Sequence, residues 1–124
     1  MDLEEYFENT DGTGILATSD SEGNVDLALY SRPYIIGENK IAFSMLERTT
    51  YQNVQSNPKA AYMFIEEVKG YKGKRLYLKA AGEETDAKIV EKIKSQRIKK
   101  HESKTNEIRH LVYFSVENIR PLSG

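Results

Sequence analysis

Three consecutive polar residues, Arg48, Thr49 and Thr50, are the strongest candidates for chemistry in this sequence. They stand where a strand-like segment ends and a helix-like segment begins. A helix start offers backbone N–H groups without intrahelical partners and the positive end of the helix dipole, and both attract anions. With two hydroxyls and a guanidinium added, this start is a reasonable cradle for a phosphate group. The alternative is that Thr49 only caps the helix and Arg48 is a surface charge. These residues alone leave both interpretations open.

Other kinds of catalytic site find little support in the sequence. The chain has no cysteine, which excludes a disulfide framework, a thiolate zinc site and a cysteine nucleophile. Two histidines are too few for a metal cluster made of histidines alone, so we expect no metal site. We interpret His110 as a partly buried structural residue at the edge of the last strand. The adjacent pairs 66–67 and 83–84 are glutamates, but neighbours in a strand point to opposite faces, so neither pair suits acid–base catalysis.

Composition limits the class of protein further. A chain of 124 residues is the size of one domain, which we place at 1–124. Its 18 basic and 19 acidic residues give a net charge of -1, which offers no large basic field for nucleic acid. The acidic start lacks the apolar segment of a secretory signal, and no apolar run approaches the ~20 residues of a membrane helix. We therefore expect a cytoplasmic protein with neither nucleic acid nor a membrane as partner.

The elements that would position the polar residues are mostly short strands. Gly, Asn and Asp clusters separate them, with no alternation of strands and long helices, and this favours an antiparallel mainly β fold with short helices. Periodicity does not distinguish a barrel from a sandwich. We expect Asp2, Thr49 or Thr50, and Thr85 to cap the three helices, and Ile89, Val90 and Ile93 to face inward. The predicted elements are helices at 2–9, 49–57 and 85–95, strands at 15–18, 25–30, 34–36, 40–44, 60–65, 76–80 and 111–116, a charged connection at 97–107 and a tail at 119–122.

The order of these segments resembles the pyridoxamine 5′-phosphate oxidase-like split barrels, a family that binds FMN. The similarity is most specific in the helix that runs from Thr50 to Pro58, whose Asn53, Asn57 and Pro58 match the family pattern of a lysine, an asparagine, a hydrophobic residue and a final Asn-Pro. The strand 14–18, its turn, Tyr30-Ser31-Arg32 and the strand 40–44 also fit. The resemblance covers most of the chain and implies an antiparallel split β-barrel.

The resemblance also implies positions for the cofactor. The residues after the second strand would lie along the isoalloxazine and ribityl groups, those at the end of the fourth strand would line the ring edge, and the helix start would hold the phosphate. Arg32, Ser31 and Ser44 are our candidates for donors to the ring. The implied cofactor-binding residues are Leu29, Tyr30, Ser31, Arg32, Ser44, Met45, Leu46, Arg48, Thr49, Thr50 and, as a support of the helix start, Asn53.

In this family the flavin lies at the interface of a homodimer, so the segment 71–75 and the tail near Arg120 are further contributors from the same or the partner chain. The implied function is an FMN-binding flavoprotein, either an oxidoreductase acting on a small molecule or an electron-transfer protein. The sequence departs from the family at Thr50, where a lysine that binds the flavin phosphate is usual. That departure favours a second hypothesis: a non-catalytic dimeric module that has lost FMN or holds a deazaflavin or haem, with His110 as the candidate haem ligand.

Overall fold

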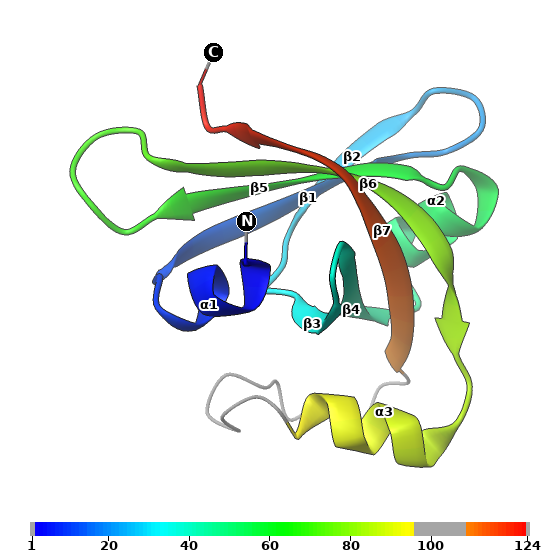
Figure 1. Ribbon diagram of the computed structural model, residues 1–124. Coiled ribbons are helices and arrows are strands. Elements are labelled where there is room, and N and C mark those ends of the chain that lie inside the picture. The colour runs from blue at the N-terminus through cyan, green and yellow to red at the C-terminus, as the bar shows by residue number, and fades with distance from the viewer. Residues whose placement is uncertain (1, 96–108, 124) are drawn as a thin grey trace.

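The computed structural model describes residues 2–95 and 109–123, so the predicted connection 97–107 lies outside the described residues. Seven strands and three short helices follow one another along this part of the chain (Figure 1). In chain order they are α1 (Leu3–Glu8), β1 (Gly12–Ser19), β2 (Val25–Leu29), β3 (Tyr34–Gly37), β4 (Lys40–Leu46), α2 (Thr49–Ser56), β5 (Lys59–Glu66), β6 (Gly73–Glu84), α3 (Ala87–Lys94) and β7 (Arg109–Pro121).

All seven strands belong to one antiparallel sheet with the order β2-β1-β5-β6-β7-β4-β3. The long strands β6 and β7 carry the sheet from one half of the molecule to the other (Figure 1). Two register shifts interrupt their pairing, and such irregularities bend a strand and increase its twist. This mainly β arrangement confirms the predicted fold class.

Alternate residues of the strands fill the inside of the sheet, because successive side chains of a strand point to opposite faces. The largest side chains with almost no exposed surface come from β1, β4, β5, β6 and β7, and Leu3 and Phe7 of α1 pack against them. The fully buried set is Leu16, Ile41, Phe43, Met45, Tyr62, Phe64, Leu76, Leu78 and Phe114. No helix within residues 2–95 and 109–123 is long and apolar enough to cross a membrane.

Two of the three predicted helix caps were wrong. Arg48 is the N-cap residue of α2, with no side-chain cap among the described residues, so neither Thr49 nor Thr50 caps this helix. Asp86 caps α3 in place of Thr85, since its carboxylate accepts a hydrogen bond from the Lys88 N–H at 2.9 Å. The short α3 places Ile93 inward but leaves Ile89 41% exposed. The cap predicted at Asp2 is confirmed by its 3.2 Å bond from the Glu5 N–H.

The predicted tail at 119–122 was also wrong, because β7 continues to Pro121. Its last residues pair with the start of β6, where Leu76 lies opposite Ile119 and Lys74 opposite Pro121. Proline lacks the N–H that a sheet needs, which suits a position at the end of a strand.

Candidate functional site

A cavity of about 420 Å³ lies where β2 and β4 end and where α2 and β7 begin. This volume is within the usual range of roughly 300–1,000 Å³ for small-molecule sites. The lining residues are Asp26, Ala28, Leu29, Tyr30, Ser31, Ser44, Leu46, Arg48, Thr49, Thr50 and Arg109. The structure thus brings together eight of the eleven residues that the sequence predicted.

The local fold explains why the start of α2 faces this cavity. Arg48 has an extended backbone, with φ -133° and ψ -167°, and its carbonyl accepts the first helical bond from the Gln52 N–H at 3.0 Å. Because no described side chain caps α2, its first turn does not use a side-chain oxygen to satisfy its N–H groups. Thr49 and Thr50, the first two residues of the helix, line the cavity there.

Two guanidinium groups give the cavity a positive side. Arg48 belongs to the turn between β4 and α2, and Arg109 is the first residue of β7. Arg109 pairs with Leu46 across the β4–β7 ladder, so both side chains lie on the same face of the sheet. Asp26 of β2 is the one acidic side chain among the lining residues.

Tyr30 and Thr50 form a hydrogen-bonded pair at the wall of the cavity. Burial raises the pKa of Tyr30, and the hydrogen bond with Thr50 and the charge of Arg109 only partly oppose that effect. The Tyr30 phenol is therefore a neutral group at ordinary pH. Its backbone is fixed by a bond from the Tyr30 N–H to the Gly14 carbonyl at 3.0 Å and by the Tyr62 hydroxyl, which donates to the Tyr30 carbonyl at 3.0 Å.

The glycine at position 14 is required by this packing. A Cβ at Gly14 would collide with the Tyr62 hydroxyl and with the Tyr30 carbonyl. The lack of a side chain at this position of β1 thus allows the end of β2 to approach closely enough to place Tyr30 at the cavity.

Ser44 contributes the clearest sign of a missing ligand. Its Oγ is buried yet has no hydrogen-bond partner among the described residues, and Ser44 lines the cavity. A buried hydroxyl without a partner is costly, by about 1–3 kcal/mol. A polar ligand in the cavity would remove that cost.

Three predicted residues lie outside the lining. Arg32 instead donates to the carbonyls of Phe7 and Thr10 at 2.6 and 3.4 Å, and thus holds the chain that leaves α1. Met45 is fully buried in the core, as its alternation with Ser44 and Leu46 requires. Asn53 holds α2 against β1, since its Nδ2 donates to the buried Thr18 Oγ1 at 3.0 Å.

Sequence reasoning missed Asp26, Ala28 and Arg109. Alternation along β2 offered a signal for the first two, because Asp26, Ala28 and Tyr30 share one face of the strand. Arg109 had no local signal. Only the pairing of β7 with β4 brings it to the cavity.

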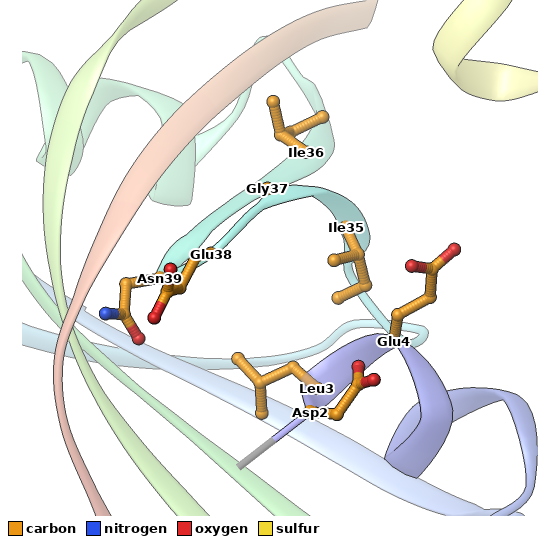
Figure 2. Close-up of a pocket in the computed structure, with 8 residues that line it drawn as sticks. All are labelled: Asp2, Leu3, Glu4, Ile35, Ile36, Gly37, Glu38 and Asn39. Carbon is orange, nitrogen blue, oxygen red and sulfur yellow. The ribbon is translucent and has the colours of Figure 1, made fainter.

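A second cavity, also of about 420 Å³, has the opposite charge (Figure 2). It lies between the start of α1 and the β3–β4 hairpin, and three of its lining residues, Asp2, Glu4 and Glu38, are acidic. Its described lining contains no lysine or arginine. Because its lining carries three carboxylates and no described cation, this cavity does not suit an anionic ligand.

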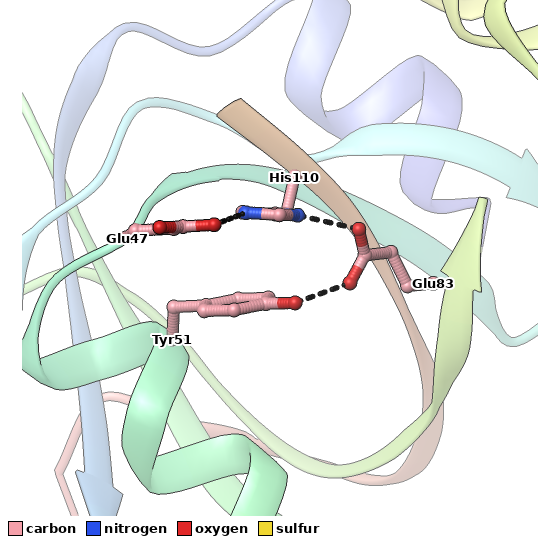
Figure 3. Close-up of polar contacts among 4 residues, drawn as sticks. All are labelled: Glu47, Tyr51, Glu83 and His110. Atoms are coloured by element: carbon pink, nitrogen blue, oxygen red, sulfur yellow. Dashed lines mark hydrogen bonds and ion pairs between the residues drawn. The ribbon is translucent and has the colours of Figure 1, made fainter. Parts of the chain in front are cut away.

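A group of four side chains next to the first cavity, which we name the His110 clamp, consists of Glu47, Tyr51, Glu83 and His110 (Figure 3). His110 contacts Glu83 through Nδ1 at 2.5 Å and Glu47 through Nε2 at 2.7 Å. The Tyr51 hydroxyl donates to the other oxygen of Glu83 at 2.5 Å, and its ring stacks on the imidazole with centroids 4.0 Å apart.

The clamp shifts the pKa of its members. Burial acts to lower the pKa of His110, but the hydrogen bonds and charges of Glu83 and Glu47 outweigh it and raise that pKa above its ordinary value. The hydrogen bond to Glu83 raises the pKa of Tyr51 to about 12. His110 is partly buried, as predicted, while Glu84 binds the Tyr113 hydroxyl and so points away from Glu83.

Comparisons with known proteins identify the fold. An FMN-binding protein from Syntrophomonas wolfei superposes with a TM-score of 0.79 at 20% identity, over 95% of this chain and 82% of its own. A putative pyridoxamine 5′-phosphate oxidase from Listeria innocua superposes with a TM-score of 0.68 at 16% identity, over 98% and 93% of the two chains. The chain has the split-barrel fold. The resemblance predicted from the sequence is thus confirmed for the fold.

The same split barrel occurs in a protein with another kind of ligand. HutZ, a haem storage protein from Vibrio cholerae, superposes with a TM-score of 0.73 at 17% identity, over 96% of this chain and 91% of its own. No family model matches the chain, and no curated protein matches it.

Proposed function

We propose that this split barrel is an FMN-binding flavoprotein and that the cavity beside α2 holds the cofactor. The observation that carries the proposal is the joint placement of Arg48, Arg109 and the start of α2 on a cavity that also contains the buried Ser44 hydroxyl. Bound FMN would supply redox chemistry, as in an oxidoreductase or an electron-transfer protein.

The donor set of the cavity fits both ends of FMN. Arg48, Arg109 and the hydroxyl of Thr49 would bind the phosphate, whose charge both guanidiniums and the helix start favour. Ala28, Leu29 and Leu46 offer apolar surface for a flat ring system, as small-molecule sites usually do. Ser31 and Ser44 would donate to the polar edge of the ring or to the ribityl chain.

The role of Thr50 in the structure explains how the site would work without a lysine at this position. Thr50 is only 6% exposed and bonds Tyr30. Its role is therefore to fix the wall of the cavity. The positive charge that a lysine would bring is supplied by Arg48 and Arg109 from two other segments.

The proposal includes a homodimer, supported by an apolar outer face on β2, β1 and β5. Val25, Leu27 and Leu29 of β2 are 83%, 71% and 76% exposed. A shallow hollow of about 220 Å³ continues this surface through Ile15, Ala17, Ala61, Met63 and Tyr77. Since Leu29 also lines the cofactor cavity, a second copy docked on this face would close the open side of the site.

The alternative is that the barrel holds haem or a deazaflavin, or serves as a non-catalytic module. The fold shared with HutZ favours haem as the second candidate. Both nitrogens of His110 are bound to carboxylates, however, so coordination of haem iron by His110 would require one of these bonds to break. The geometry therefore supports FMN over haem ligated by His110.

The visible absorption spectrum of the purified protein tests the proposal. We expect a flavin spectrum that survives desalting, either at once or after FMN is added to colourless protein. Haem added in the same way should be removed by desalting. A protein that retains haem and takes up no FMN would overturn the proposal and favour the alternative.

A further inference from the structure

The His110 clamp joins four separate segments at the edge of the cofactor cavity (Figure 3). Glu47 comes from the turn before α2, Tyr51 from α2, Glu83 from the end of β6 and His110 from the start of β7. The imidazole lies flat against the Tyr51 ring, with an interplanar angle of 13°, and contacts a carboxylate at each nitrogen.

Two clamp residues are direct chain neighbours of the arginines of the cavity. Glu47 precedes Arg48, and His110 follows Arg109. On β7 the two neighbours point to opposite faces, so that Arg109 reaches the cavity while His110 reaches the clamp. A change in the clamp would therefore act on the backbone next to both arginines.

The hydrogen-bond requirements of the clamp favour a protonated imidazole. A carboxylate can only accept, and a neutral imidazole has only one N–H, whereas the charged ring donates from both nitrogens. The titratable and charged groups that face His110 are Glu47, Glu83 and the Tyr51 hydroxyl bound to Glu83, while its partner in β4 is the buried Met45. No basic side chain is recorded against the ring among the described residues.

Loss of the proton from His110 should release Glu47 rather than Glu83. The Glu83 carboxylate keeps its bond from Tyr51, while the Glu47 side chain is 59% exposed. A released Glu47 carboxylate lies next to Arg48 in the chain and competes with an anionic ligand for that guanidinium.

We propose that His110 is a positioning residue of the cofactor site, which holds Glu47 away from Arg48 and so makes phosphate binding in the cavity depend on pH. This inference rests on the proposed binding of FMN. Phosphate binding is strong while His110 is charged and weaker once His110 is neutral.

The first test measures the FMN dissociation constant from about pH 5.5 to about pH 9, the range in which histidine titrates. All variants carry His101→Gln, which leaves His110 as the sole histidine of the chain. The parent should bind FMN roughly fivefold more tightly than His110→Gln at the acidic end, an effect the size of a good ion pair. The two should converge at the alkaline end. The phosphate of FMN also gains charge near about pH 6, but this affects both proteins and cancels in the ratio.

A Glu47→Gln variant provides the matched control, because it removes the competing carboxylate at an exposed position. At alkaline pH it should bind FMN roughly fivefold more tightly than the parent, and the two should converge at the acidic end. A ratio of the dissociation constants of His110→Gln and the parent that stays constant with pH overturns the proposal. A Glu47→Gln variant that binds FMN no more tightly than the parent at alkaline pH also overturns it.

A second measurement does not need FMN. In the protein without ligand, the amide signals of Thr49 and Thr50 in ¹⁵N NMR spectra should titrate with the same midpoint as the His110 ring and stop titrating in His110→Gln. Amide shifts of Thr49 and Thr50 that do not change at the midpoint of His110 contradict the positioning role. If these shifts follow the His110 titration while FMN fails to bind at any pH, the positioning role is supported and the proposed cofactor is rejected.

Discussion

Arg48 and Arg109 reach one cavity from segments that are distant in the sequence, and this convergence is the basis of the assignment at the scale of residues. The predicted residues that line the cavity lie at 29–31, at 44 and 46, and at 48–50, where the local pattern matched the family. The sequence did not predict Arg109, because only the pairing of β7 with β4 brings this residue to the cavity. Arg32 lies outside the lining because it binds the carbonyls of Phe7 and Thr10, which belong to an earlier part of the chain.

Replacement of either arginine by alanine should weaken FMN binding by about 1.5–3 kcal/mol, the usual contribution of a hydrogen bond to a charged group. Fluorescence titration with FMN measures the effect. Lys88→Ala, which removes a positive charge from exposed α3, should leave the affinity unchanged. Equal affinities for the parent, Arg48→Ala and Arg109→Ala would refute the phosphate cradle.

Ser44→Ala should separate stability from binding. Removal of a buried hydroxyl without a partner should leave the ligand-free protein as stable as the parent or more stable by up to about 2 kcal/mol, while FMN affinity falls. Urea unfolding and FMN titration of the same samples give both numbers. A large loss of stability without any loss of affinity would show that Ser44 has a structural partner instead of a ligand.

At the scale of elements, helix α2 positions the first part of the site. The sequence predicted its end well, because Asn57 before Pro58 cannot continue a helix. It also predicted the start at Thr49, but it did not predict Arg48 as the N-cap residue, because Thr50 is engaged with Tyr30 and Thr49 faces the cavity. The bond from Asn53 to Thr18 then fixes the helix on β1.

Asn53→Ala should destabilise the protein by about 1–3 kcal/mol, because it leaves the buried Thr18 hydroxyl without its donor. Urea unfolding measures the change, and FMN affinity should fall as well, since the start of α2 loses its support. Gln55→Ala, at an exposed position of the same helix, should change stability by less than about 0.5 kcal/mol. Similar stabilities of the two variants would contradict the role of Asn53.

The clamp should also affect the pH dependence of stability. The pKa of Glu83 lies below its ordinary value of 4.5, so its contribution is present above pH 4.5 and is lost as the pH falls through the lowered pKa. The pKa of His110 lies above 6.5, so its contribution is complete below pH 6.5 and is lost as the pH rises through the raised pKa. The stability difference between the parent and Glu83→Gln should therefore be largest between pH 4.5 and 6.5. Urea unfolding across this range checks it, and a difference that grows above neutral pH would contradict the arrangement.

At the scale of the whole molecule, the alternation of buried and exposed residues along the strands determines which side chains fill the barrel and which form its outer face. Short strands and tight turns were enough to predict an antiparallel fold, and the family pattern was needed to choose the split barrel. The full length of β7 was not predictable, because Arg109 and Ile119 gain strand structure from β4 and β6 and not from their own neighbours.

Leu27→Asp should disrupt the proposed homodimer, because it places a charge in the middle of the apolar face formed by β2, β1 and β5. We expect light scattering to give the mass of a dimer for the parent and of a monomer for this variant, with weaker FMN binding. Ile89→Asp, an exposed apolar position on α3, should remain a dimer. A parent that is monomeric at micromolar concentration would contradict the dimer.

The most direct test of the account compares FMN with riboflavin, which lacks only the phosphate. We predict that the parent binds FMN at least about tenfold more tightly than riboflavin, since two guanidiniums and the start of α2 act on the phosphate. The difference should vanish when Arg48 and Arg109 are both alanine. Equal affinities of the parent for FMN and riboflavin would contradict the placement of the phosphate and, with it, the proposed site.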